Sequence, residues 1–292
     1  MLIRVLMIFL SICTLTCSAE ARVWDRVKSI FSQKDPIPAI KVLVVENEDG
    51  IILEVKGKYN IFDPYTGSRL GTRFVGKGHL IQSMAGGLKW GEEFPGVYQI
   101  QITPDDPRIT TVVDGIEYRG SIYIYDIKGR ISVVNEVPLE DYINSVLALE
   151  FKEPLSPEAM ASIAIIERTK AMYQATHAPN SYWHVRAKTV GYEGNAVVGR
   201  SNGVDQAVAT TRYMVMTRGG KGSIETFPAK WSTTGSSQGT VLSVDDAEGM
   251  SAKGKHAAEI LSKAFPNTSL QLTYKLPQPV RPTSASDNNK TN

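Results

Sequence analysis

The sequence predicts an α+β fold, with a β-rich N-terminal region followed by a mixed domain of two central helices and flanking strands. Short apolar or alternating runs separated by turn residues fill residues 40–117. Two helical segments follow between residues 138 and 179, and strand-like runs return after them. We therefore expect a β-rich region over residues 40–117 and a second domain over residues 118–275.

Residues 1–21 are expected to be an export signal. Arg4 supplies the positive charge, residues 5–15 form a short apolar stretch, and residues 19–21 read Ala-Glu-Ala, a typical cleavage site. The apolar stretch is shorter than a membrane span. Cleavage after Ala21 would place the protein in the periplasm or cell envelope. A lipoprotein acylated at Cys17 is the alternative.

Compartment and composition exclude several kinds of site. The two cysteines, Cys13 and Cys17, both lie in the expected signal, so the cleaved chain would have neither a disulfide nor a thiolate metal site. The net charge is +2 and no basic block occurs, which argues against a nucleic-acid partner. Residues 22–39 resemble a linker, and residues 276–292 form a Pro/Ser/Asn-rich tail expected to be disordered.

Strands and turns can be placed in order along the β-rich region. Residues 41–45 and 51–55 are strand-like and flank Asn-Glu-Asp-Gly, which predicts a hairpin. Residues 63–67 form a turn, and residues 97–102 alternate as a half-buried strand should. A further hairpin is predicted over residues 118–134, with its turn at Lys-Gly-Arg.

The second region begins with helices. The first helix starts at Pro138; the second has Ser156 at its N-cap and Pro157 at its first position, and its apolar content predicts a central buried helix. Four later elements are predicted: a short helix over 205–211, a strand over 213–216, a glycine-rich turn over 219–222 and a last helix over 257–264.

Glu150 has a notable position on the first helix. Leu139, Ile143, Val146 and Glu150 are spaced i, i+4, i+7, i+11, which places them on one side of a helix. An apolar setting disfavours the charged form of a carboxyl group, which suits a general acid near neutral pH. The alternative is a helix-end glutamate that turns outward as the chain leaves the helix.

Several motifs occur in a characteristic order. They are Tyr118-Arg119-Gly120-Ser121, Val134-Asn135-Glu136-Val137-Pro138-Leu139-Glu140-Asp141-Tyr142, Ala148-Leu149-Glu150, Ser156-Pro157-Glu158-Ala159-Met160 and Arg168-Thr169. This order resembles the SpoIID family (stage II sporulation protein D and the related amidase enhancers). The resemblance runs from about residue 41 to residue 272 and is strongest over 118–172.

The resemblance implies an activity. Active members are lytic transglycosylases that cut peptidoglycan glycan strands, and Glu150 falls on their catalytic acid. One carboxylate and no cofactor suffice, because the sugar's own 6-hydroxyl replaces water as the nucleophile and yields a 1,6-anhydro ring. We expect glycan strands stripped of peptides as the substrate, and a cell-wall amidase or division proteins as possible partners.

The resemblance also implies substrate-binding residues. Arg168 matches the family's A-R-T arginine, and either the substrate or a structural ion pair with Glu167 would account for it. Tyr192 and Gly194 match a Y-x-G motif. The remaining candidates form a hydroxyl-rich segment: Ser232, Thr233, Thr234 and Gly235.

The chain also departs from the family pattern. Val190 replaces a usual Gln, Ser232 stands where His is common, and the zinc-binding cysteines of some members are missing. We expect no metal site, with His177 and His184 as ordinary surface or core residues. These losses favour a rival reading, a non-catalytic glycan-binding module that stimulates an amidase. An envelope scaffold without glycan contact is a third possibility.

Overall fold

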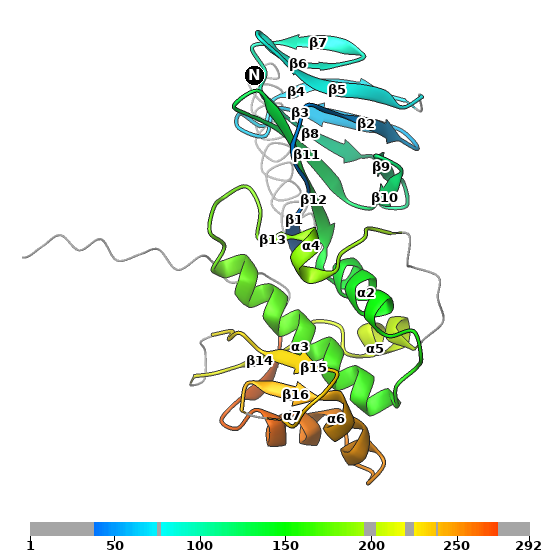
Figure 1. Cartoon of the computed structure of the whole chain (residues 1–292), viewed down its shortest axis with the longest axis vertical. Coiled ribbons are helices and arrows are strands. Elements are labelled where there is room, and N and C mark those ends of the chain that lie inside the picture. Colours follow the sequence, from blue (N-terminus) through cyan, green and yellow to red (C-terminus); the bar gives the residue numbers. More distant parts are fainter. Residues whose placement is uncertain (1–37, 75–76, 196–202, 220–224, 238, 274–292) are drawn as a thin grey trace, which may run out of the picture. The chain divides into compact units, whose positions relative to one another are not determined.

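The computed structural model describes residues 38–74, 77–195, 203–219, 225–237 and 239–273 (Figure 1). Every described residue belongs to one compact unit. The expected signal, nearly all of the expected linker, most of the predicted glycine turn and the expected tail lie outside the described residues. Within them, strands and helices are both abundant, which confirms the α+β prediction.

Seven strands form one sheet, in the order β13-β1-β12-β11-β8-β3-β4, and all neighbours are antiparallel except β1 and β13. The strands are β1 (Ala39–Glu48), β3 (Tyr59–Phe62), β4 (Arg69–Arg73), β8 (Gln99–Pro104), β11 (Ser121–Ile127), β12 (Arg130–Pro138) and β13 (Val185–Arg186). The pairing of Ile127 with Arg130 confirms the predicted β11–β12 hairpin. Along β11, Ile122 and Ile124 enter the main core, whereas Tyr123 and Tyr125 belong to a cluster on the opposite face.

Six strands form the second sheet, in the order β10-β9-β2-β5-β6-β7. They are β2 (Gly50–Val55), β5 (His79–Met84), β6 (Gly87–Trp90), β7 (Glu92–Pro95), β9 (Thr111–Val113) and β10 (Ile116–Tyr118). Ile40 and Val42 of β1 share one core cluster with Ile51 and Leu53 of β2, so the two sheets pack their apolar faces together.

The predicted hairpin between residues 41–45 and 51–55 is wrong, although both strands exist. β1 pairs with β12 and β13, and β2 pairs with β5 and β9. The turn between β1 and β2 carries the chain from one sheet to the other, which buries both strands on the shared core. β1 and β8 also pair with β12 and β11, so the regions before and after residue 118 contribute to one sheet.

The two central helices are α2 (Leu139–Glu150) and α3 (Pro157–Thr176). As predicted, Ser156 is the N-cap residue of α3 and Pro157 its first residue. The Ser156 hydroxyl makes no capping bond; instead its N–H and hydroxyl bind Glu248 Oε1 at 2.7 and 3.1 Å. α3 is buried around most of its circumference, which confirms its central position (Figure 1).

Most of the remaining elements pack against α3 or against its neighbours. α5 (Val204–Thr210), β14 (Met214–Thr217) and α7 (Ala257–Ala264) confirm the predicted short helix, strand and last helix. The others are α4 (Ala187–Val190), β15 (Lys230–Ser232), β16 (Val241–Ser243), α6 (Val244–Ser251) and β17 (Ser269–Leu272). Across the described ranges, no helix is both long enough and apolar enough to span a membrane.

Candidate functional site

Glu150 is the last residue of α2 and its side chain is exposed. Leu139, Ile143 and Val146 are buried as the spacing predicts, but the expectation that Glu150 shares their apolar setting is wrong. The helix stops at this point, and Phe151, in extended backbone conformation, turns into the core in place of Glu150. The outward-turned alternative therefore describes the side chain.

Phe151 links the end of α2 to β15. Its ring lies 5.1 Å, centroid to centroid, from the ring of Trp231, which is only partly buried. Since Phe151 follows Glu150 and Trp231 precedes Ser232, this contact brings the acid-bearing helix end close to the predicted hydroxyl segment. Trp231 is not among the residues predicted to bind substrate, although an aromatic residue beside a hydroxyl-rich turn was a usable signal.

The hydroxyl segment forms a tight turn at the surface. Ser232 Oγ donates to Thr234 O at 2.7 Å, and Gly235 adopts a positive φ of 96° that favours glycine. Thr233, Thr234 and Gly235 are exposed. The turn thus presents hydroxyl groups to solvent on a defined backbone.

A hydrogen bond from the Trp231 indole to Glu167 orients the Trp231 ring. The Glu167 carboxylate is fully buried on α3 and accepts a hydrogen bond from Trp231 Nε1 at 3.1 Å. Lys170 pairs with the same carboxylate at 3.0 Å. The structure thereby assigns Glu167 to Trp231 and Lys170, and not to Arg168 as one alternative proposed. A buried charge with both partners in place fixes the orientation of the indole ring.

Arg168 is also fully buried, and Glu140 at the start of α2 is its partner. Nε and Nη2 of Arg168 bind the two Glu140 carboxylate oxygens at 3.0 and 2.7 Å, and Nη1 donates to Met214 O at 3.1 Å. This arrangement favours the ion-pair alternative with a different acid. The guanidinium connects α2, α3 and β14. It is not exposed to solvent, so a substrate at the surface cannot contact it.

Tyr192 and Gly194 lie in a buried cluster of motif residues. The Tyr192 hydroxyl donates to Asn135 Oδ1 at 2.7 Å, and its ring lies 6.1 and 5.7 Å from those of Tyr118 and Tyr142. Gly194 has a φ of 70°, and a Cβ there would stand 2.3 Å from a backbone oxygen. The motifs therefore meet in space, but as packing that supports α2.

The other two acids near Glu150 in the sequence are Glu153 and Glu158. Glu158 accepts the Ala257 N–H at 2.6 Å, which lowers the pKa of its carboxyl and caps the start of α7. Glu153 is exposed. Of the described acids in residues 150–158, Glu158 is committed to α7, which leaves Glu150 and Glu153 as the exposed carboxylates.

The histidines have separate environments. His177 is exposed at the end of α3, whereas His184 Nδ1 accepts the Lys41 N–H at 3.1 Å. Burial, with a smaller contribution from the Lys41 charge, lowers the pKa of His184 to about 4. In the part of the chain that the structure describes, no three His, Cys, Asp or Glu side chains cluster as metal ligands would.

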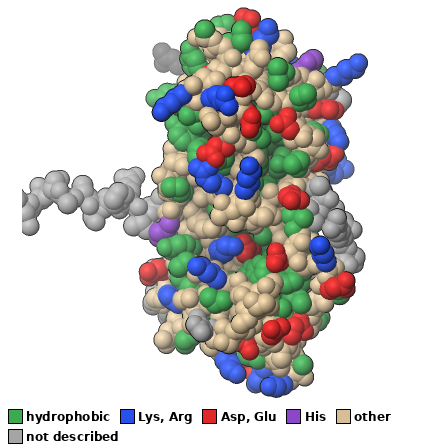
Figure 2. Space-filling model, viewed as in Figure 1, with side chains coloured by type: hydrophobic (Ala, Val, Ile, Leu, Met, Phe, Trp, Pro, Cys, Tyr) green, Lys and Arg blue, Asp and Glu red, His purple; other side chains and the backbone are tan. Residues whose placement is uncertain are grey.

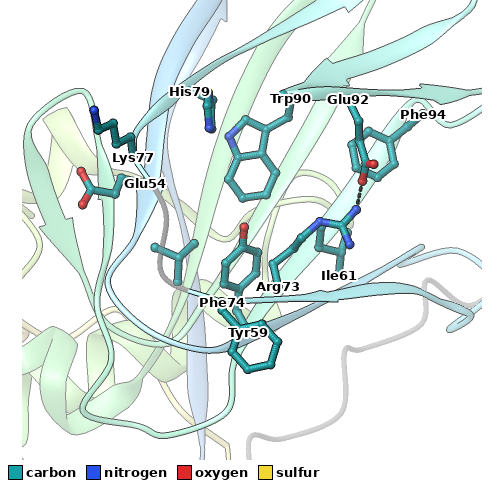
Figure 3. Close-up of a pocket in the computed structure, with 12 residues that line it drawn as sticks. Glu54, Tyr59, Ile61, Arg73, Phe74, Lys77, His79, Trp90, Glu92 and Phe94 are labelled. Atoms are coloured by element: carbon teal, nitrogen blue, oxygen red, sulfur yellow. Dashed lines mark ion pairs between the residues drawn. The ribbon is translucent and has the colours of Figure 1, made fainter.

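A cavity of about 430 Å³ lies between the two sheets, away from Glu150 (Figure 3). Tyr59 and Trp90 pack in its wall with their ring centroids 5.7 Å apart, and Trp90 Nε1 donates to Leu53 O. Arg73 and Glu92 point toward each other and form an ion pair (Figure 3). None of the residues expected to bind substrate lines this cavity.

Charged side chains of both signs are interspersed over the face shown in Figure 2. Among the described residues of that face, no field of one sign dominates.

Comparison with known proteins shows which family and which relatives this chain resembles. A model described as stage II sporulation protein, SpoIID, matches residues 127–218, a span that includes Glu150, Arg168, Tyr192 and Gly194. An uncharacterized protein of Chlamydia pneumoniae is 34% identical over 196 residues, covering 65% of this chain and 71% of the relative. An uncharacterized protein of Chlamydia muridarum is 35% identical over 202 residues, covering 68% of each. An uncharacterized protein of Brachyspira hyodysenteriae is 28% identical over 183 residues, covering 62% of this chain and 49% of the relative. No solved structure matches the chain.

Proposed function

Because the chain belongs to the SpoIID family, whose members have a cell-wall-related role, we propose that it is an exported protein that remodels peptidoglycan. In this proposal it is a lytic transglycosylase that cleaves peptide-stripped glycan strands. Glu150 is the single general acid and base.

The observation that carries the proposal is the neighbourhood of Glu150. An exposed carboxylate ends α2, and the Phe151–Trp231 contact joins that end to the exposed hydroxyl turn. A sugar ring stacked on Trp231 would have hydroxyl groups on one side and the carboxyl group on the other. Aromatic faces and hydroxyl groups are the partners that pyranose rings use.

The reaction needs two proton transfers. Glu150 first gives its proton to the glycosidic oxygen, and the bond between that oxygen and C1 breaks. The 6-hydroxyl oxygen of the same sugar then forms a bond to C1, and its proton passes to the Glu150 carboxylate. Atoms and charge balance without water, and the enzyme ends in its starting protonation state.

In this proposal the bound glycan strand itself has to cover Glu150 and exclude water from it. Closing a site over a carboxyl group expels water and favours the neutral form, which is the proton donor. The open surface around Glu150 leaves this cover to the bound glycan. Glu167 contributes by holding Trp231, the ring on which the glycan would lie.

One observation favours the rival function, a glycan-binding module that stimulates an amidase. Arg168 and Tyr192, which the family resemblance suggested as substrate contacts, are engaged in the protein interior. Fewer polar side chains are therefore available to contact a substrate than the family resemblance implied. In this alternative function, the surface around Glu150 and Trp231 binds glycan but does not cleave it.

The deciding experiment is digestion of denuded glycan strands, with mass spectrometry of the products. We expect 1,6-anhydro ends from the wild-type protein and a loss of about two to four orders of magnitude in rate for Glu150→Gln. Glu153→Gln is the matched control, because Glu153 is an exposed acid three residues away. Equal rates in wild type and Glu150→Gln would remove Glu150 from the reaction. Glycan binding without cleavage by the wild type, together with stimulation of an amidase, would establish the rival.

A further inference from the structure

A second cavity, of about 300 Å³, has tyrosine rings in its wall. Tyr65 lies in the turn between β3 and β4, Tyr98 precedes β8, Tyr125 lies on β11, and Tyr182 lies in the loop between α3 and β13. Four segments that are distant in sequence therefore bring tyrosines to one place.

Three of these four tyrosines are exposed to solvent. Tyr65, Tyr98 and Tyr182 are 87%, 49% and 45% exposed, and Tyr182 meets the buried Tyr125 edge-on, with ring centroids 5.0 Å apart. Grouped exposed aromatic residues on a protein surface commonly mark a binding site. Tyrosine combines an apolar ring face with a polar hydroxyl, which suits a ligand that carries both kinds of group.

Local hydrogen bonds hold the tyrosine-bearing loops in place. Asp63 Oδ1 accepts the Tyr65 N–H at 2.9 Å, and Asn180 Oδ1 accepts the Tyr182 N–H at 2.8 Å. Asp126, at the end of β11, accepts the N–H of Gly129 at 2.8 Å. The rings therefore stand on defined turns, which lowers the ordering cost of binding.

The charge of the cavity narrows the class of ligand. Asp63 and Asp126 line it, and no lysine or arginine occurs among its described lining residues. The Tyr65 N–H, with further hydrogen bonds, lowers the pKa of Asp63, so this carboxylate is ionised at neutral pH. Anionic ligands are repelled, whereas hydroxyl and amide groups can donate to the carboxylate oxygens.

The cavity in Figure 3 differs in these respects. Its Tyr59 and Trp90 are each only 8% exposed, and its Arg73 and Glu92 form an ion pair with each other. Of the Phe, Tyr and Trp side chains that line the Figure 3 cavity only Phe74 is exposed, whereas Tyr65, Tyr98 and Tyr182 are all exposed at the tyrosine cavity.

We infer that the tyrosine cavity is a subsite for the neutral N-acetylglucosamine units of a glycan strand, separate from Glu150. The choice of a glycan rests on the proposed function, whereas binding at this cavity requires no cleavage. The sugar rings stack on Tyr98 and Tyr182, and their hydroxyl groups donate to Asp63 and Asp126.

The test is calorimetric titration of the purified protein with a neutral N-acetylglucosamine hexamer. Tyr98→Ala and Tyr182→Ala should each weaken binding about 3- to 10-fold, since an aromatic contact contributes on the order of 1 kcal/mol. Phe74→Ala is the matched control, because Phe74 is 70% exposed and lines the other cavity. An anionic hexagalacturonate should not bind in the tyrosine cavity.

Two results would overturn the inference: unchanged hexamer affinity in both tyrosine variants, or binding of a proline-rich peptide at the tyrosines in place of the hexamer. Strand digestion separates the two proposals: tyrosine-dependent hexamer binding by a wild-type protein that cleaves no strands would refute only the enzymatic proposal.

Discussion

Replacing Arg168 with Met tests the buried ion pair that connects the two central helices. The change removes the guanidinium but keeps a long apolar side chain, and it leaves the Glu140 carboxylate, whose side chain is 13% exposed, without its cation. Met214 O also loses its side-chain donor. Breaking one partner of a buried pair costs about 3–5 kcal/mol, a large part of the roughly 5–15 kcal/mol by which a domain is stable.

Urea unfolding followed by circular dichroism measures this cost. With a slope of about 3 kcal/mol per M, the midpoint should fall by about 1–2 M. The double variant Arg168→Met, Glu140→Leu should recover part of the loss, because no unpaired charge remains. Arg108→Met is the control: Arg108 pairs with Asp106 at the surface, and the midpoint should not move. If Arg168→Met is as stable as the wild type, the guanidinium does not hold Glu140, and its assignment as a substrate-binding residue regains support.

Four further predictions concern stability and the proposed site. The pKa of His184 is about 4 in the fold and about 6.5 when unfolded, so the unfolded chain binds more protons between these values. The free energy of unfolding should therefore fall by up to about 3 kcal/mol as pH drops from about 6.5 to 4, and His184→Gln should flatten that decline in pH-dependent melts. Gly194→Ala should lower the melting temperature, because its φ of 70° and the Glu117 carbonyl oxygen 2.3 Å from the added Cβ both oppose a side chain; an unchanged melting temperature would show that this turn relaxes freely. Trp231→Ala should raise the KM for glycan strands, whereas Trp231→Phe should retain most of the affinity; equal KM values in both would argue against stacking at this ring. Any strand cleavage should survive chelator treatment, and loss of activity restored by zinc would contradict the expectation of a metal-free site.

Local patterns predicted the elements well. The start of α3 at Pro157, the turn before Arg130 and the range of α7 follow from preferences and interactions within a few residues of each position. The order of the motifs likewise predicted the family, since it depends on the linear chain alone.

Strand pairing and side-chain direction were harder to predict from the sequence. The β1–β2 hairpin failed because local turn residues do not choose between a partner next in sequence and β12, which lies some ninety residues away. Glu150 was expected inside because helical spacing assumes that the helix continues, whereas α2 ends there and Phe151 takes the buried position.

By itself, the sequence determined which segments are strands and helices, the α+β class and the family, because propensity, caps and motif order are local properties. Only the tertiary structure decided that Arg168 binds Glu140, that Glu167 holds Trp231 and that four tyrosines share one cavity. Each of these contacts joins residues about 30 or more positions apart. The packing of both sheets and of α3 selects such partners, and no pattern within a single segment encodes them.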